Sequence, residues 1–213
     1  MRSLSKRSLL ISLVALPILA YAPLGSAAAG PMEDGARQFV QGLADRAVGV
    51  LQSKAPKAQR DQEFAQILTD GFDVRAIAVF CLGSYWNRAT EQERQEYLKL
   101  FQDLIVQTYS ARLGSVYHGE KLEIGQARPD GNQGVWVSSK ILTTKPEDEP
   151  IKIDWRVRQP GGKNYKIIDV VVTNVSMVIT QRDDFVGILQ RNGGNIADFL
   201  NMLRDKVNKL QAS

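Results

Sequence analysis

Apolar residues recur at helical spacing over much of the stretch from residue 33 to residue 114. A first helix is predicted by the apolar positions Phe39, Leu43, Val48 and Leu51, and it should end before Pro56. Two shorter helices are expected behind Asp61 and Asp73, whose carboxylates would act as N-caps. Gly71 and Gly83 are expected to end these two helices.

The clearest helical signal begins at Thr90. Thr90 and Glu93 have the spacing of a capping box, in which a hydroxyl and a carboxylate satisfy each other's backbone donors. The side chains behind this box recur at helical spacing: Tyr97, Phe101, Leu104, Ile105, Thr108, Tyr109 and Arg112. The pattern predicts a helix of about six turns that ends at Gly114.

The hydrophobic period changes to two in the middle of the chain. Alternating segments separated by turn residues predict four antiparallel strands near residues 122–128, 135–142, 151–158 and 165–172. The third strand has the cleanest alternation, with Ile151, Ile153, Trp155 and Val157 on one face and Lys152, Asp154, Arg156 and Arg158 on the other. This pattern is typical of a sheet with one dry face and one wet face.

Helical spacing returns after residue 179. Thr180 with Asp183, and Asn195 with Asp198, predict the starts of two final helices. The order of the elements predicts an α+β domain over residues 33–210, with helices packed on one face of a roughly four-stranded antiparallel sheet.

Residues 1–28 are expected to be a cleaved signal peptide. Arg2, Lys6 and Arg7 precede an apolar run over residues 9–24, and small residues follow. The run is shorter than the roughly 20 residues that span a bilayer. The chain has 27 basic and 23 acidic side chains, and three of the basic ones lie in this leader. The remainder is near neutral, so no nucleic-acid partner is expected.

The residues that usually carry catalysis are sparse. The chain has one histidine, His118, and one cysteine, Cys81, so neither a histidine metal cluster nor an internal disulfide is expected. Cys81 lies in an apolar stretch and is interpreted as a buried, inert thiol. With no phosphate-binding loop and no Gly-x-Ser-x-Gly elbow, no cofactor and no enzymatic activity are predicted. Asp169 is the one acid that an enzyme could use in an apolar cavity, and its simpler interpretation is an outward-facing strand residue paired with a nearby Lys or Arg.

Bulky side chains on the long helix and on the sheet could hold these two elements apart and enclose an apolar pocket. The residues predicted to line that pocket are Tyr97, Phe101, Leu104, Ile105, Tyr109, Val137, Ile151, Ile153, Trp155, Val157 and Ile167.

Two segments carry a resemblance to a known family. Residues 82–109, which begin Leu-Gly-Ser-Tyr-Trp-Asn-Arg, and residues 175–185, Val-Ser-Met-Val-Ile-Thr-Gln-Arg-Asp-Asp-Phe, resemble the MlaC or toluene-tolerance auxiliary family of periplasmic phospholipid-binding proteins. The resemblance covers roughly residues 35–208. It implies a periplasmic carrier that holds acyl chains in an apolar pocket, leaves the head group at the mouth and catalyses no reaction.

The resemblance also implies two membrane partners. The carrier would shuttle phospholipid between an outer-membrane lipoprotein–porin complex and an inner-membrane ABC transporter with an MCE subunit, and so affect outer-membrane lipid asymmetry. A hopanoid-associated branch of the family (HpnM-like) makes a polycyclic lipid an alternative ligand. A small-molecule enzyme using Asp169 and an interaction module with a filled core remain alternatives. The lipid, the transport direction, the partner surface and the oligomeric state stay open.

Overall fold

The computed structural model describes residues 30–144 and 149–212, and for residues 110–116 only the backbone. The predicted signal peptide lies outside the described residues. The helices are α1 (Pro31–Gln52), α2 (Lys57–Gly71), α3 (Val74–Leu82), α4 (Tyr85–Arg88), α5 (Glu91–Val116), α6 (Met177–Arg191) and α7 (Ile196–Gln211). The strands are β1 (Lys121–Pro129), β2 (Gly134–Leu142), β3 (Ile151–Arg158), β4 (Lys166–Val172) and β5 (Val175–Ser176), and a short 3₁₀ turn covers Pro160–Gly162. Among the described helices, none combines the length and the apolar character that a membrane span requires.

Three of the predicted helix caps are confirmed. The carboxylate of Asp73 accepts from the Ala76 N–H at the start of α3. Thr90 and Glu93 form the reciprocal capping box at the start of α5. The side chain of Asn195 caps α7. Each cap satisfies a backbone donor that the first turn of a helix leaves without a partner.

Two predicted caps are wrong because the helices begin earlier. Helix α2 starts directly after Pro56, so Asp61 lies inside it and accepts from the Lys57 ammonium at 3.2 Å. Helix α6 starts after Ser176, whose hydroxyl accepts from the Ile179 N–H. Thr180 therefore lies within α6. Pro56 and Ser176 are the last extended residues before α2 and α6, so Asp61 and Thr180 come too late in the chain to cap these helices.

The strands form one antiparallel sheet in the order β1-β2-β3-β4-β5, so the four predicted strands are joined by a fifth of two residues. Directly opposed residues on antiparallel strands share a face. The register therefore assigns one apolar face to Leu122, Ile124, Ala127, Val135, Val137, Ser139, Ile141, Ile151, Ile153, Trp155, Val157, Ile167, Val170, Val172 and Val175. The opposite face is polar, and its Trp136 ring has the guanidinium carbons of Arg128 and Arg156 at 5.3 and 5.4 Å.

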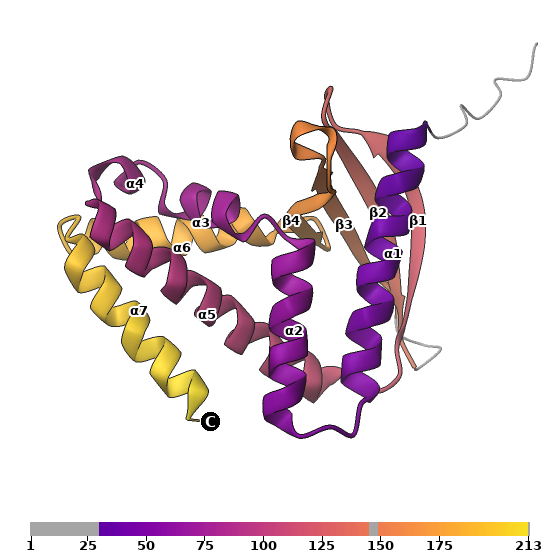
Figure 1. Cartoon of the computed structure of the whole chain (residues 1–213), viewed down its shortest axis with the longest axis horizontal. Coiled ribbons are helices and arrows are strands. Elements are labelled where there is room, and N and C mark those ends of the chain that lie inside the picture. The colour runs from indigo at the N-terminus through magenta and orange to yellow at the C-terminus, as the bar shows by residue number, and fades with distance from the viewer. Residues whose placement is uncertain (1–29, 145–148, 213) are drawn as a thin grey trace, which may run out of the picture.

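The helices lie in two places relative to the sheet (Figure 1). Helix α1 packs along the apolar face over β1 and β2, and α2 lies between α1 and α5. Helices α3, α5, α6 and α7 form a helical lobe beside the sheet, and α3 and α6 reach it at β4, next to the short edge strand β5. The predicted α+β class is confirmed, but most helices extend from the edge of the sheet and do not cover its face.

The helical lobe has a core of its own. Tyr97, Phe101, Phe185 and Phe199 are each exposed by 2% or less, and their rings pack with centroids 5.1 to 6.3 Å apart. The Tyr97 hydroxyl donates to the Ala78 carbonyl at 2.8 Å, which ties α5 to α3. Aromatic rings at these separations interact favourably beyond their burial, so this cluster holds the four helices together.

Candidate functional site

The apolar face of the sheet is closed at one end and open at the other. Under α1, side chains such as Val135, Val137 and Val157 are exposed by 1% or less. Towards the start of β3, most of the face is not fully covered. We call this region the open part of the apolar face; it consists of Ile141, Ile151, Trp155, Val170 and Val172, all of which are half-buried or exposed. These side chains are therefore apolar and only partly covered by the rest of the described chain.

Trp155 is held in a fixed orientation within this open part. Its indole Nε1–H donates to the Ser139 hydroxyl at 2.8 Å, and this hydroxyl donates in turn to the Ile153 carbonyl at 3.1 Å. Ser139 is only 4% exposed and lies between Ile124 and Ile153 of the neighbouring strands. A buried hydroxyl and a buried indole N–H both need partners, and here they satisfy each other. The sequence reasoning did not identify Ser139 as a supporting residue.

Two half-buried side chains link the sheet to the helical lobe. Phe72, just after α2, packs against both the sheet core and a small cluster between α2 and α5. Ile105 packs against both that cluster and the helical core. The apolar interior is therefore continuous from the sheet to the lobe, but its two connecting points are not fully closed.

The predicted pocket residues fall into separate groups. Val137, Val157, Ile167 and Trp155 belong to the sheet core; Tyr97, Phe101 and Leu104 belong to the helical core; Ile105 and Tyr109 lie at the α2–α5 cluster. Ile153 is buried and Ile151 is 41% exposed, both on the apolar face. The structure does not bring the sheet-core residues and the helical-core residues into one cluster. The role of these residues as ligand contacts stays a prediction.

A shallow cavity of about 450 Å³, wide open to solvent, lies at the junction of α2 and α3 with the β3–β4 connection. It is lined by Thr69, Phe72, Asp73, Val74, Arg75, Pro160, Lys163, Asn164 and Lys166. Three of these side chains are cationic and one is acidic. The cavity meets the apolar interior at Phe72, so a polar group held here would adjoin apolar groups on the sheet.

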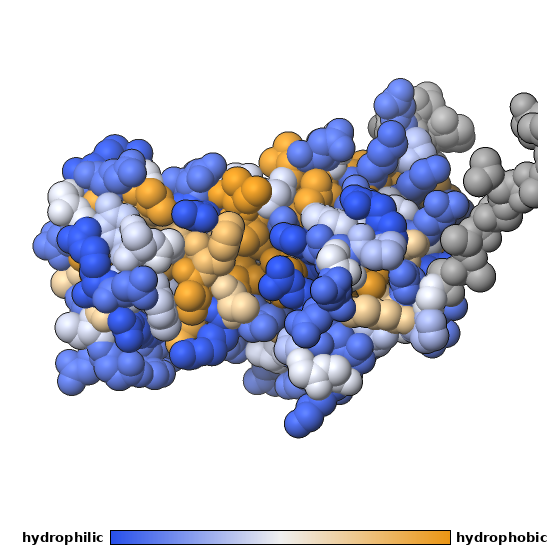
Figure 2. Space-filling model, turned by 90° about the horizontal axis from the view of Figure 1, so that it is seen from above, coloured by the Kyte–Doolittle hydropathy of each residue, from blue (hydrophilic) through white to orange (hydrophobic). Residues whose placement is uncertain are grey.

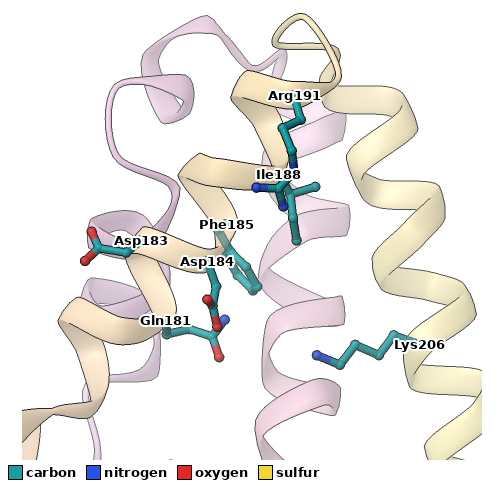
Figure 3. A pocket seen from close by; sticks show the side chains of 7 residues that line it. All are labelled: Gln181, Asp183, Asp184, Phe185, Ile188, Arg191 and Lys206. Atoms are coloured by element: carbon teal, nitrogen blue, oxygen red, sulfur yellow. The ribbon is translucent and has the colours of Figure 1, made fainter.

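A second cavity, of about 190 Å³, lies between α6 and α7. Figure 3 shows Lys206 extending from α7 towards α6, Asp184 and Phe185 reaching into the gap, and Asp183 pointing away. None of the residues predicted for the pocket lines either cavity. This cavity is small and edged by charges, which does not suit an acyl chain.

Asp169 has a structural role at the start of α6. Its carboxylate accepts from the Ser176 hydroxyl at 2.7 Å and from the Val178 N–H at 3.2 Å. The prediction that Asp169 pairs with a Lys or Arg is therefore wrong. Its carboxylate is held by the N-terminus of α6, which is the positive end of the helix. Asp169 lines neither of the two cavities described above.

Cys81 is buried, as the sequence indicated. It is 0% exposed, and burial raises the pKa of the thiol to about 12. Among the described residues, no group of His, Cys, Asp and Glu side chains is arranged to hold a metal ion.

Comparison with known proteins adds a family and a fold. Residues 41–205 match the model of the family described as MlaC protein. The chain is 25% identical over 163 residues to the intermembrane phospholipid transport system binding protein MlaC of Haemophilus influenzae, covering 73% of this chain and 75% of that protein. It is 25% identical over 203 residues to the toluene tolerance protein Ttg2D of Pseudomonas putida, covering 92% of this chain and 87% of that protein.

The fold resembles that of a solved structure. A phospholipid-binding protein from Ralstonia solanacearum, solved in complex with a phospholipid, superposes with a TM-score of 0.69 at 19% identity, covering 83% of this chain and 98% of that one. The family match spans most of the chain and includes both segments that carried the resemblance. The chain belongs to the MlaC protein family.

Proposed function

We propose that this protein is a periplasmic phospholipid carrier that holds acyl chains against the open part of the apolar face. The observation that carries the proposal is the partly exposed apolar surface around Trp155 and Val170, which continues through Phe72 and Ile105 to the helical lobe. The names of the relatives and the ligand of the Ralstonia protein support phospholipid as the cargo. The leader-like residues 1–28 support export to the periplasm.

Half-buried apolar side chains connect the open part of the apolar face to the helical lobe through Phe72 and Ile105, and we call this line of contact the seam. Among the described residues it is a contact between side chains and not an open chamber. Acyl chains would enter by separating half-buried side chains, and those side chains would close again when the lipid leaves. The buried core under α1 and the aromatic core of the lobe would stay intact, because their side chains are fully packed. A carrier with this arrangement keeps its fold whether it is loaded or empty.

The energetics favour reversible exchange. Two acyl chains of about 15 methylenes each would cost on the order of 24 kcal/mol in water, at about 0.8 kcal/mol per methylene. The chains are already dry in a bilayer, so their transfer to a dry protein seam is nearly balanced. Transfer can then run in either direction. We propose that an inner-membrane ABC transporter and an outer-membrane complex set that direction.

The cationic cavity suits the head group. Arg75, Lys163 and Lys166 line it next to Phe72, so a lipid phosphate placed there would lie beside the seam. Lys166 also donates to two backbone carbonyls at the end of α2, which fixes its position.

Neighbouring residues of β4 offer a matched test. Val170 lies on the apolar face and Val171 on the opposite face. Purified protein stripped of lipid would be incubated with vesicles containing a fluorescent phospholipid and separated by gel filtration. Val170→Glu should abolish loading, because a carboxylate would face the acyl chains, whereas Val171→Glu should load normally. Equal loading of both variants, each shown to be folded by circular dichroism, would contradict the proposed site.

A further inference from the structure

Helices α3 and α6 present an apolar surface that the fold does not cover. Helix α3 has a single charged residue, Arg75, and is apolar on all sides. A helix of this kind is normally buried all round. Here Phe80 on α3 is 42% exposed, and Ile179 on α6 is 53% exposed. We call this surface, made up of Ala76, Val79, Phe80, Val175, Ile179 and Val186, the α3–α6 patch.

The patch is continuous with the open part of the apolar face. Val175 is 51% exposed and pairs with Val172, which pairs in turn with Ile153. Since paired residues share a face, Val175 extends the apolar face to its outer edge. Four of the five large apolar side chains that are exposed in the described chain are therefore on the patch or on that face: Phe80, Ile151, Val175 and Ile179. Figure 2 shows apolar surface across the middle of the molecule, with hydrophilic surface towards both ends.

The turn that presents Val175 is the two-residue loop of the β4–β5 hairpin. Thr173 and Asn174 have φ angles of 47° and 67°, and they are the described residues other than glycine with positive φ. Positive φ is uncommon for a β-branched residue such as threonine. The Thr173 N–H donates to the Lys152 carbonyl at 2.9 Å, which holds the turn in place. Positive φ at both central residues is what a tight two-residue hairpin of this kind requires, and the turn returns the chain so that Val175 lies beside Val172.

Cationic side chains accompany the patch. The guanidinium carbon of Arg182 lies 4.8 Å from the centre of the Phe80 ring, and that of Arg75 lies 5.7 Å from the Trp86 ring. A guanidinium stacked on a ring keeps its N–H donors in its own plane, where they can bind phosphate. Helix α3 has no acidic residue, and the exposed acids of α6 are Asp183 and Asp184. An apolar centre with arginines beside it complements an anionic lipid surface.

We propose that the α3–α6 patch docks the protein onto an anionic phospholipid bilayer, with Phe80, Val175 and Ile179 entering the interface and Arg75 and Arg182 contacting lipid phosphates. This inference rests on the proposed function, because docking here sets the open part of the apolar face next to the membrane. A lipid can then leave the bilayer without crossing a wide layer of water. The surface of the protein thus provides a continuous apolar path from the membrane to the seam.

Vesicle flotation tests the docking separately from lipid carriage. Vesicles of phosphatidylglycerol and phosphatidylethanolamine would be mixed with the protein at low salt and floated through a density gradient. We expect the protein to float with them, and to lose most of this binding with phosphatidylcholine vesicles or at high salt. The double variant Phe80→Ser/Ile179→Ser should bind at least 10-fold more weakly. Met202→Ser is the matched control, because Met202 is 51% exposed on α7 outside the patch.

Each outcome separates the two proposals. Protein that carries lipid when purified but does not float would overturn membrane docking and leave the carrier function standing. Protein that floats through the patch but never contains lipid would support docking and contradict the carrier function. If the patch variant floats like the wild type, docking by this surface is refuted. A further result would assign the patch to a protein partner in place of a bilayer. In that case the wild type would not float, and the patch variant would exchange lipid more slowly than the wild type only when a membrane protein complex is present.

Discussion

Replacement of Trp155 by glutamate should abolish lipid loading. The indole lies on the open part of the apolar face and is oriented by its hydrogen bond to Ser139. An acyl chain lying across the indole would cover about five methylenes, worth about 4 kcal/mol at about 0.8 kcal/mol each. A carboxylate at this position would forfeit that contribution, which corresponds to a loss of roughly 10³-fold in lipid affinity.

Two further variants isolate the cause. Trp155→Phe keeps an apolar ring, although a smaller one, and removes the donor to Ser139, so we expect normal loading and a stability loss of about 1 kcal/mol. Trp136→Glu makes the same exchange on the neighbouring strand but on the opposite face, between Arg128 and Arg156, and should load normally.

The assay measures lipid per protein after incubation of lipid-free protein with phospholipid vesicles and gel filtration. Circular dichroism and thermal unfolding establish that each variant is folded. A folded Trp155→Glu variant that loads one phospholipid per chain would refute the placement of the acyl chains on this face. Loss of loading in Trp136→Glu would show that the effect is not specific to the apolar face.

Three other predictions concern groups away from the lipid site. Asp169→Asn should weaken the hydrogen bonds to the first turn of α6 and lower the free energy of unfolding in urea by about 1–2 kcal/mol, without loss of lipid loading. The control Asp183→Asn, at an exposed position, should change the free energy of unfolding by less than about 0.5 kcal/mol. Cys81 should be unreactive towards a thiol reagent at pH 8 in the native protein and react once urea unfolds it, since burial raises the pKa of its thiol to about 12; rapid reaction of the native protein would contradict the burial. The hydrogen bond from Arg156 lowers the pKa of Asp130 in the folded protein below its unfolded value of 3.8. The Asp130 carboxylate therefore contributes stability above pH 3.8, and this contribution is lost as the pH falls through the lower folded pKa. Arg156→Gln should therefore lower the free energy of unfolding by about 1 kcal/mol at pH 7 and by less near pH 2, and an equal loss at both pH values would exclude this pair as the cause.

Local signals predicted the elements well. The alternation of residues 151–158 identified both faces of β3, and the register then placed Lys152, Asp154 and Arg156 on the polar face as expected. The Thr90–Glu93 pair fixed the start of the longest helix. These features depend on residues close in sequence, so their physical basis is visible without a structure.

The partners of each apolar face could not be predicted in the same way. The spacing of Tyr97 and Phe101 showed that they share a helix face, but not that this face packs on Phe185 and Phe199. Helical periodicity specifies which residues are buried together and leaves open what covers them. The sequence therefore predicted a long helix above the sheet, whereas α5 lies mostly in a separate lobe.

The supporting residues of the site were also missed for a physical reason. Ser139 looks like an ordinary strand residue until its partner Trp155 is placed across from β2. Phe72 follows a helix and has no periodic neighbours, so no pattern marks it as the link between the sheet and the α2–α5 cluster. Both roles arise from contacts between segments that are distant in sequence.

Native mass spectrometry of the purified protein, followed by organic extraction of what it releases, tests the central claim most directly. We predict one phospholipid per chain, identified by the mass of the extracted lipid. An extracted hopanoid in its place would reassign the cargo to a polycyclic lipid. A folded, ligand-free protein that also takes up no lipid from vesicles would contradict the carrier function.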